Sequence, residues 1–168
     1  AVNAGEHVTW SGPHRRRPLV DVTVFPRPET PLRIWLGTGG SPESVYRAAE
    51  WGLPMFLGIL GGTPEHWAQY GKAYRAAWAA AGHPVDTADV AVAVHGFVAD
   101  TDEQARATYL EYETRMFTEG MAEMGRPAPA RLERASAYER GGMVFVGGPQ
   151  EIADRIVLLA HGRIPSRA

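Results

Sequence analysis

A repeated alternation of apolar runs, glycine-rich turns and helical segments is the strongest constraint that this sequence places on its fold. The apolar runs are short and nearly continuous, which is typical of strands covered on both faces in a parallel sheet. Strand–helix alternation along a chain predicts parallel β/α units and an α/β fold. The predicted strands cover residues 33–36, 54–60, 91–98 and 143–146, and the helices that follow them end near residues 51, 81, 124 and 160.

The junctions between strands and helices carry residues that start helices. Ser41 and Thr63 stand where an N-cap hydroxyl accepts a backbone amide, and a proline follows each at the first helical position. Thr101, with Gln104 three residues later, fits a capping box. Glycines before Ser41 and Thr63 let the chain turn sharply off the strand. These residues predict that helices begin directly after each cap.

Two architectures fit this alternation. A doubly wound sheet suits four or five such units, but its usual G-x-G-x-x-G fingerprint with a later acidic residue is absent from the sequence. A TIM barrel has eight units and at least about 200 residues, so a chain of 168 residues could form only part of one. The periodicity alone does not decide between the two architectures.

The segment before the alternation, residues 1–31, is mostly loop-like. Residues 20–25 alternate apolar and polar side chains and are followed by Pro26 and Pro28, which suits an edge strand or an extended arm. We therefore predict an extended arm over residues 1–31 and a β/α body over residues 32–168.

Charge and composition argue against several classes of function. The formal net charge is −2, which gives no electrostatic footprint for nucleic acid or an anionic membrane. The chain has no cysteine, and its apolar runs fall short of the roughly 20 residues of a membrane span. No basic-then-apolar signal pattern opens the sequence. These features predict a soluble, cytoplasmic protein with no nucleic-acid or membrane partner.

The glycine-rich junctions are the candidate ligand sites, because both architectures bind ligands where strands end and helices begin. The first junction contains Gly39, Gly40, Ser41 and Ser44, whose amides and hydroxyls could converge on an anion at the helix start. The same residues are also good helix-start chemistry without any ligand. General knowledge of TIM barrels instead favours a phosphate site after the last strands, at Gly147 and Gly148. The residues leave these alternatives open.

Other reactive constellations are missing from the sequence. The six histidines show no metal-ligand spacing, so no metal site is predicted. No G-x-S-x-G elbow or Walker-type loop is present. His95 lies in a predicted strand, where a hydrogen-bonded structural role is favoured over a role in lining a ligand ring or handling protons. Trp67, Tyr70, Tyr74 and Trp78 recur at helical spacing and are expected to pack one helix onto the sheet.

Several stretches of the sequence together resemble the luciferase-like, flavin-dependent monooxygenases. The first and most specific is P-L-R-I-W-L-G-T-G-G-S-P-E-S-V-Y-R-A-A-E-W-G-L-P, which begins at Pro31. V-T-W-S-G-P-H-R and V-F-P-R-P precede it, and H-G-F-V-A-D-T-D-E-Q-A-R and V-G-G-P-Q-E-I-A-D-R-I follow in the family's order. The resemblance covers nearly the whole chain.

This resemblance implies the C-terminal half of a TIM (β/α)8 barrel, with four parallel β/α units as strands five to eight. It implies a monooxygenase or oxidoreductase that uses O2 and reduced flavin mononucleotide (FMN), or deazaflavin F420 in relatives, on a small organic substrate. The family's phosphate-binding positions fall on Ser41 and Ser44, with Gly39 and Gly40 shaping the approach. No catalytic residue carries over, because the family's first four strands are missing.

Half a barrel has open sheet edges and inner faces that need a cover. We therefore expect a homo-oligomer or pairing with a missing N-terminal half. The alternative function is a catalytically silent half-barrel that acts as an assembly or structural module.

Overall fold

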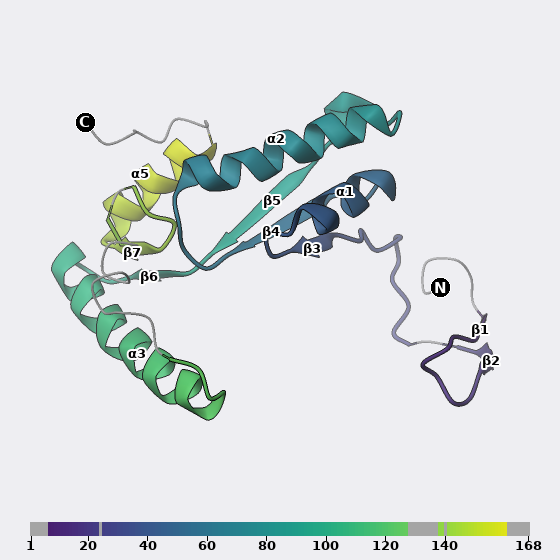
Figure 1. Cartoon of the computed structure of the whole chain (residues 1–168), viewed down its shortest axis with the longest axis horizontal. Coiled ribbons are helices and arrows are strands. Elements are labelled where there is room, and N and C mark those ends of the chain that lie inside the picture. The colour runs from purple at the N-terminus through teal and green to yellow at the C-terminus, as the bar shows by residue number, and fades with distance from the viewer. Residues whose placement is uncertain (1–6, 24, 128–137, 140, 161–168) are drawn as a thin grey trace. The chain divides into compact units, whose positions relative to one another are not determined.

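The computed structural model describes residues 7–23, 25–127, 138–139 and 141–160 of the chain (Figure 1). The chain forms two compact units, Ala1–Ile34 and Trp35–Ala168. The described part of the second unit is an α/β fold of parallel strands and α-helices. Its elements are β3 (Leu36–Thr38), α1 (Pro42–Glu50), β4 (Met55–Ile59), α2 (Pro64–Ala80), a 3-10 turn at Val85–Thr87, β5 (Val90–Val94), β6 (Gly96–Val98), α3 (Asp102–Glu123), β7 (Phe145–Gly147) and α5 (Pro149–Ala160).

The first unit contains a short antiparallel hairpin. Strand β1 (Val8–Trp10) pairs with β2 (Leu19–Val22), with Val8 opposite Val22 and Trp10 opposite Leu19. The amide of Asp21 donates to the Thr9 hydroxyl at 3.1 Å, which fixes the pair where the register shifts. Part of the predicted alternation at residues 20–25 therefore forms a strand, and its partner β1 lies in a segment that the sequence indicated as loop.

The strands of the second unit are parallel and follow chain order. Leu36 of β3 lies opposite Met55 of β4, which lies opposite Val90 of β5. Strand β5 passes through His95 into β6, and β6 pairs in parallel with β7. The His95 carbonyl accepts the Phe145 amide at 2.8 Å, so the chain changes partner from β4 to β7 at His95. For this reason the strand predicted over residues 91–98 appears as two short strands.

Two predicted strands are displaced toward the C-terminus. The strand predicted at residues 33–36 begins only at Leu36, whose amide donates to the Pro54 carbonyl at 2.9 Å. Pro54 has no amide hydrogen and precedes β4, so the residues before Leu36 have no strand opposite them. The strand predicted at residues 143–146 begins at Phe145, because its partner β6 begins at Gly96.

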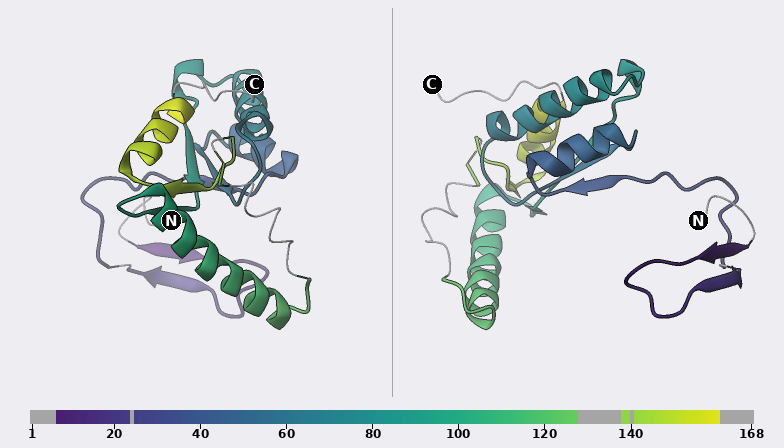
Figure 2. Two further views of the ribbon diagram at one scale, coloured as in Figure 1. Left: turned by 90° about the vertical axis from the view of Figure 1, so that its left-hand side faces the viewer. Right: turned by 45° about the vertical axis from the view of Figure 1, so that its right-hand side comes forward.

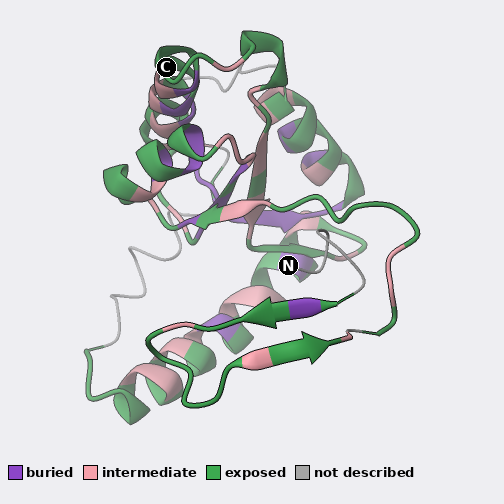
Figure 3. Cartoon of the chain, turned by 90° about the vertical axis from the view of Figure 1, so that its right-hand side faces the viewer, coloured by how far each residue is buried: buried purple, intermediate pink, exposed green. Residues whose placement is uncertain are grey.

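The main core lies between the strands and the helices α1, α2 and α5. Met55, Leu57 and Ile59 of β4 are buried on this face, whereas Phe56 on the other face is 39% exposed. Figure 3 shows buried residues, in purple, on strands and on parts of the helices. Buried side chains of α1 and α2 complete this core, namely Val45, Ala48, Ala49, Tyr74 and Trp78. Trp67 and Tyr70 are partly buried against it, so the predicted aromatic face of α2 is confirmed.

Helix α3 lies on the opposite face of the strands from α1, α2 and α5 (Figure 2). Val144 and Val146 form a second buried cluster with Ala105 of α3 and Tyr138, whereas Phe145 belongs to the main core. Strand β7 is therefore covered on both faces. In a closed barrel, the face opposite the outer helices would be covered by other strands, whereas in this chain α3 covers that face of β7. The assignment to strands five to eight of a half-barrel stays a prediction.

Candidate functional site

The first strand–helix junction turns through Gly39 and Gly40 into the start of α1. Thr38 is buried at the end of β3, and its hydroxyl donates to the Phe56 carbonyl at 3.3 Å, which fixes the departure of the loop. Gly40 has a φ of +91°, a conformation that side-chain-bearing residues rarely adopt. Ser41 is then the N-cap of α1, with extended backbone angles. The predicted helix start is confirmed.

The two serine hydroxyls of this junction lie next to each other. The Ser41 and Ser44 Oγ atoms are 3.0 Å apart, and the Ser44 hydroxyl donates to the Ser41 carbonyl at 2.8 Å. The Ser44 amide donates to the Ser41 hydroxyl at 3.3 Å, as an N-cap requires. Gly39, Gly40, Ser41 and Ser44 are thus gathered at one helix end. Their role in binding a ligand stays a prediction.

Aromatic side chains of α2 lie against the same loop. A Cβ atom added to Gly40 would meet the Trp67 ring at 3.1 Å and the Tyr70 hydroxyl at 3.6 Å. The Trp67 and Tyr70 rings are 5.4 Å apart, and Trp67 Nε1 donates to the Gly61 carbonyl at 2.7 Å. The helical spacing of these aromatics predicted packing, but nothing in the sequence indicated that Trp67 supports the loop at Gly40.

At the second junction, polar groups of the turn form hydrogen bonds within the protein. Gly62 has a φ of +85°, and Thr63 caps α2 by accepting the His66 amide at 3.4 Å. The Gly62 carbonyl accepts the Met143 amide at 3.1 Å, which ties this turn to the residues before β7. This geometry fits a structural turn.

The third junction also starts its helix as predicted. Thr101 is the N-cap of α3, and its hydroxyl accepts the Gln104 amide at 3.2 Å.

The fourth junction, before α5, is occupied by a carboxylate of the chain itself. The Gly148 amide donates to Oδ1 of Asp102 at 2.6 Å. A Cβ atom on Gly147 would meet Cγ of Glu151 at 2.8 Å and the same Asp102 oxygen at 3.0 Å. An anion entering here would therefore meet a negatively charged carboxylate and closely packed side chains. Between the two phosphate sites left open by the sequence, this geometry favours the first junction.

A comparison with models of known protein families identifies the family of this chain. The family model of the luciferase-like monooxygenases matches residues 1–164 of the chain. The chain belongs to this family. The resemblance read from the sequence is confirmed.

Solved structures of related proteins share this fold. Monooxygenase RslO1 from Streptomyces bottropensis matches with 25% identity and a TM-score of 0.63, over 97% of this chain and 47% of its own. The oxygenating constituent of 3,6-diketocamphane monooxygenase from Pseudomonas putida, solved with FMN, matches with 19% identity and a TM-score of 0.59, over 94% of this chain and 49% of its own.

A third solved structure is a coenzyme F420-dependent tetrahydromethanopterin reductase from Methanopyrus kandleri. It matches with 15% identity and a TM-score of 0.61, over 97% of this chain and 51% of its own. The luciferase-like chain thus spans about half the length of the solved structures that it matches. A comparison with curated protein sequences gave no match.

One ionisable cluster of this luciferase-like chain lies where α3 meets the strands. The Tyr109 hydroxyl is 3.4 Å from Nδ1 of His95, and the Phe97 and Tyr109 rings are 6.3 Å apart. Burial, and secondly the nearby charge of Glu113, raise the pKa of Tyr109 to about 12. Tyr109 is therefore neutral at ordinary pH and can donate to His95. This contact fits the structural role favoured for His95.

The described part of the chain also bears on metal and membrane binding. Within residues 7–23, 25–127, 138–139 and 141–160, no three His, Asp or Glu side chains are grouped so that they could hold a metal ion. Over the same ranges, no helix is both long and apolar enough to span a membrane.

Proposed function

We propose that this chain is the C-terminal half of a flavin-dependent monooxygenase that oxidises a small organic substrate with O2. In this proposal, β3, β4, the β5–β6 strand and β7 are strands five to eight of a TIM barrel, over residues 32–168, and residues 1–31 are an extended arm. Family membership and the parallel, sequential order of β3, β4 and β5 support it. A doubly wound sheet can also contain three sequential strands, so family membership carries the proposal.

The proposed cofactor site is the first junction, where Gly39, Gly40, Ser41 and Ser44 hold the phosphate of FMN. The supporting observation is the pair of serine hydroxyls 3.0 Å apart at the start of α1. The positive end of the helix dipole favours an anion there, although Glu43 in the first turn opposes it. The Asp102 carboxylate beside Gly148 argues against the competing junction.

The residues of this chain would position the cofactor, and bound reduced flavin supplies the oxygen chemistry. Ser41 and Ser44 would reorient their hydroxyls from each other toward the phosphate oxygens. Gly40 would let the backbone approach, with Trp67 supporting the loop from behind. Deazaflavin F420 is the alternative cofactor, because some of the solved structures are named as F420-dependent enzymes.

In this proposal, the other half of the barrel is needed to exclude water from the flavin site. We propose that the chain pairs with an N-terminal half or forms a homo-oligomer, in the cytoplasm.

A second candidate function is a catalytically silent module that serves assembly. It is favoured by α3, which covers the face of β7 that a barrel would turn inward.

The discriminating experiment is a titration with FMN and with riboflavin, which lacks the phosphate. The chain is completed by fusion to the N-terminal half of a relative, and flavin fluorescence reports binding. Ser44→Ala should weaken FMN binding by about 10- to 150-fold, since a hydrogen bond to a charged group contributes roughly 1.5–3 kcal/mol. Riboflavin binding should change far less.

Thr63→Ala is the control, because it removes a hydroxyl from the start of α2, at the second junction. It should leave FMN affinity unchanged. Equal losses of FMN and riboflavin affinity in Ser44→Ala would place the phosphate elsewhere. Absence of flavin binding by the completed barrel would favour the silent module.

A further inference from the structure

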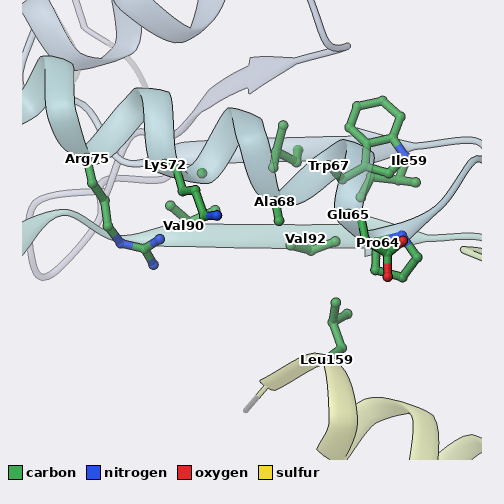
Figure 4. Close-up of a pocket in the computed structure, with 12 residues that line it drawn as sticks. Ile59, Pro64, Glu65, Trp67, Ala68, Lys72, Arg75, Val90, Val92 and Leu159 are labelled. Carbon is green, nitrogen blue, oxygen red and sulfur yellow. The ribbon is translucent and has the colours of Figure 1, made fainter. Parts of the chain in front are cut away.

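An apolar groove runs along β5 on the face that carries α1, α2 and α5 (Figure 4). Its volume is about 420 Å3. Its floor is formed by Val90 and Val92, with Ala68 of α2 on one side and Leu159 of α5 on the other. Val92 is 39% exposed, although it belongs to a strand of the sheet. The groove is therefore an apolar strip of sheet that the neighbouring helices leave uncovered.

Charged side chains lie in a fixed order along the rim of this groove. Glu65 lies at one end, and Lys72 and Arg75 lie toward the other end, beside Val90. Glu65 and Arg75 are ten residues apart on α2, so the charges span about 15 Å along the helix. The groove thus presents an acid, then two bases, beside an apolar floor.

Helix α3 carries an uncovered apolar stripe. It has 22 residues, and its buried side chains are Ala105 and Glu113. Beyond its first turns, Tyr112 is 63% exposed and Met116 is 50% exposed, one turn apart on the same side of the helix. Figure 1 shows that this part of α3 runs away from the strands.

The charges beside this stripe complement those of the groove. Arg115, Glu119 and Glu123 follow one another at intervals of one turn, with Glu119 and Glu123 aligned with Tyr112 and Met116. Arg115 and Glu123 are separated by about 12 Å along the helix. Arg115 Nε and Glu119 Oε1 form an exposed ion pair at 2.9 Å, which docking would exchange for contacts with the groove. With the two helices parallel, Arg115 would then meet Glu65, and the two glutamates would meet Lys72 and Arg75.

We propose that the exposed half of α3 docks into the β5 groove of a second copy of this chain. The chain's own α3 does not fill its groove, because its first turns cover the opposite face of β7. Two copies could exchange helices reciprocally, which closes both grooves in one symmetric dimer. This contact differs from pairing through open sheet edges, and it does not depend on flavin binding.

Sedimentation of the full chain over a range of concentrations tests the proposal. Met116→Asp on the helix and Ala68→Asp in the groove should each raise the dimer dissociation constant by about tenfold or more, because each buries a charge in an apolar contact. The controls are Ala107→Asp, at an exposed site on another side of α3 from the stripe, and Ala76→Asp, at an exposed site on α2 outside the groove. Both should associate like the unchanged chain.

Variants with reversed charges distinguish a loss of docking from damage to the fold. Lys72→Glu with Arg75→Glu, and separately Glu119→Lys with Glu123→Lys, should each weaken the dimer by several-fold. An equimolar mixture of the two variants should form a heterodimer, because one reversed groove then meets one reversed helix. The proposal would be overturned if the unchanged chain were a monomer at every concentration. It would also be overturned if the groove and helix variants dimerised as strongly as the unchanged chain, or if the mixture of charge-reversed variants formed no heterodimer.

Discussion

The carboxylate of Asp102 accepts a hydrogen bond of 2.6 Å from the amide of Gly148, which ties the start of α3 to the turn before α5. Asp102→Ala leaves this part-buried amide without its acceptor. We expect the free energy of unfolding to fall by about 1.5–3 kcal/mol, the usual contribution of a hydrogen bond to a charged group. Urea denaturation followed by circular dichroism measures the loss.

Glu103→Ala is the matched control for that substitution. Glu103 is the neighbouring acid in the same first turn of α3, and it is exposed. Its removal should cost less than about 1 kcal/mol, through the helix dipole alone. Equal losses in the two variants would mean that the helix dipole, rather than the bond to Gly148, accounts for the effect of Asp102.

Two adjacent glycines of the first junction should respond differently to alanine. Gly40 has a φ of +91°, and an added Cβ would meet the Trp67 ring at 3.1 Å. At Gly39 an added Cβ meets nothing within 4 Å. We expect Gly40→Ala to destabilise the fold by about 1–2 kcal/mol and Gly39→Ala to be nearly neutral. Thermal unfolding of both variants would check this, and equal effects would contradict the loop geometry.

Tyr109 should make the stability of the chain sensitive to alkaline pH. Burial raises the pKa of its phenol to about 12 in the folded chain, compared with 10.0 without the fold. The folded state therefore holds this proton more tightly than the unfolded state. The associated stability is present below pH 10 and is lost as pH rises from about 10 to about 12.

Comparison with Tyr109→Phe isolates this contribution. The unchanged chain should lose stability relative to the variant over that alkaline interval, as measured by urea denaturation at a series of pH values. Tyr46→Phe, which alters an exposed tyrosine on α1, is the control. If the difference in unfolding free energy between the unchanged chain and Tyr109→Phe stays constant from about pH 10 to about pH 12, the pKa of the Tyr109 phenol is not raised by folding.

Features decided by neighbours in the sequence were predicted well. The hydroxyls of Ser41, Thr63 and Thr101 accept the expected amides at the starts of α1, α2 and α3. A cap needs only its own residue and the next turn, so a short sequence determines it. The aromatic face of α2 was equally readable, because Tyr74 and Trp78 repeat at helical spacing.

Features decided by distant partners were not predicted. The bond from Gly148 to Asp102 joins residues 46 positions apart. The face on which α3 packs is set by Val146 of β7 and by Val144 just before it. A continuous apolar run is typical of a strand covered on both faces, so the sequence does not show which face α3 covers. The observed strand limits differ from the predicted ones for the same reason, since the strands begin at Leu36 and Phe145, where a partner strand lies opposite.

Strand β7 is covered on both faces, and this determines which elements unfold together. The buried side chain of Phe145 packs into the main core, and those of Val144 and Val146 pack in the cluster that includes Ala105 of α3. Their amides should then exchange with solvent hydrogen only when both layers open together. The unit that melts cooperatively would thus be a sandwich of α3, β7 and α5, and the edge strand β3 would fray before it.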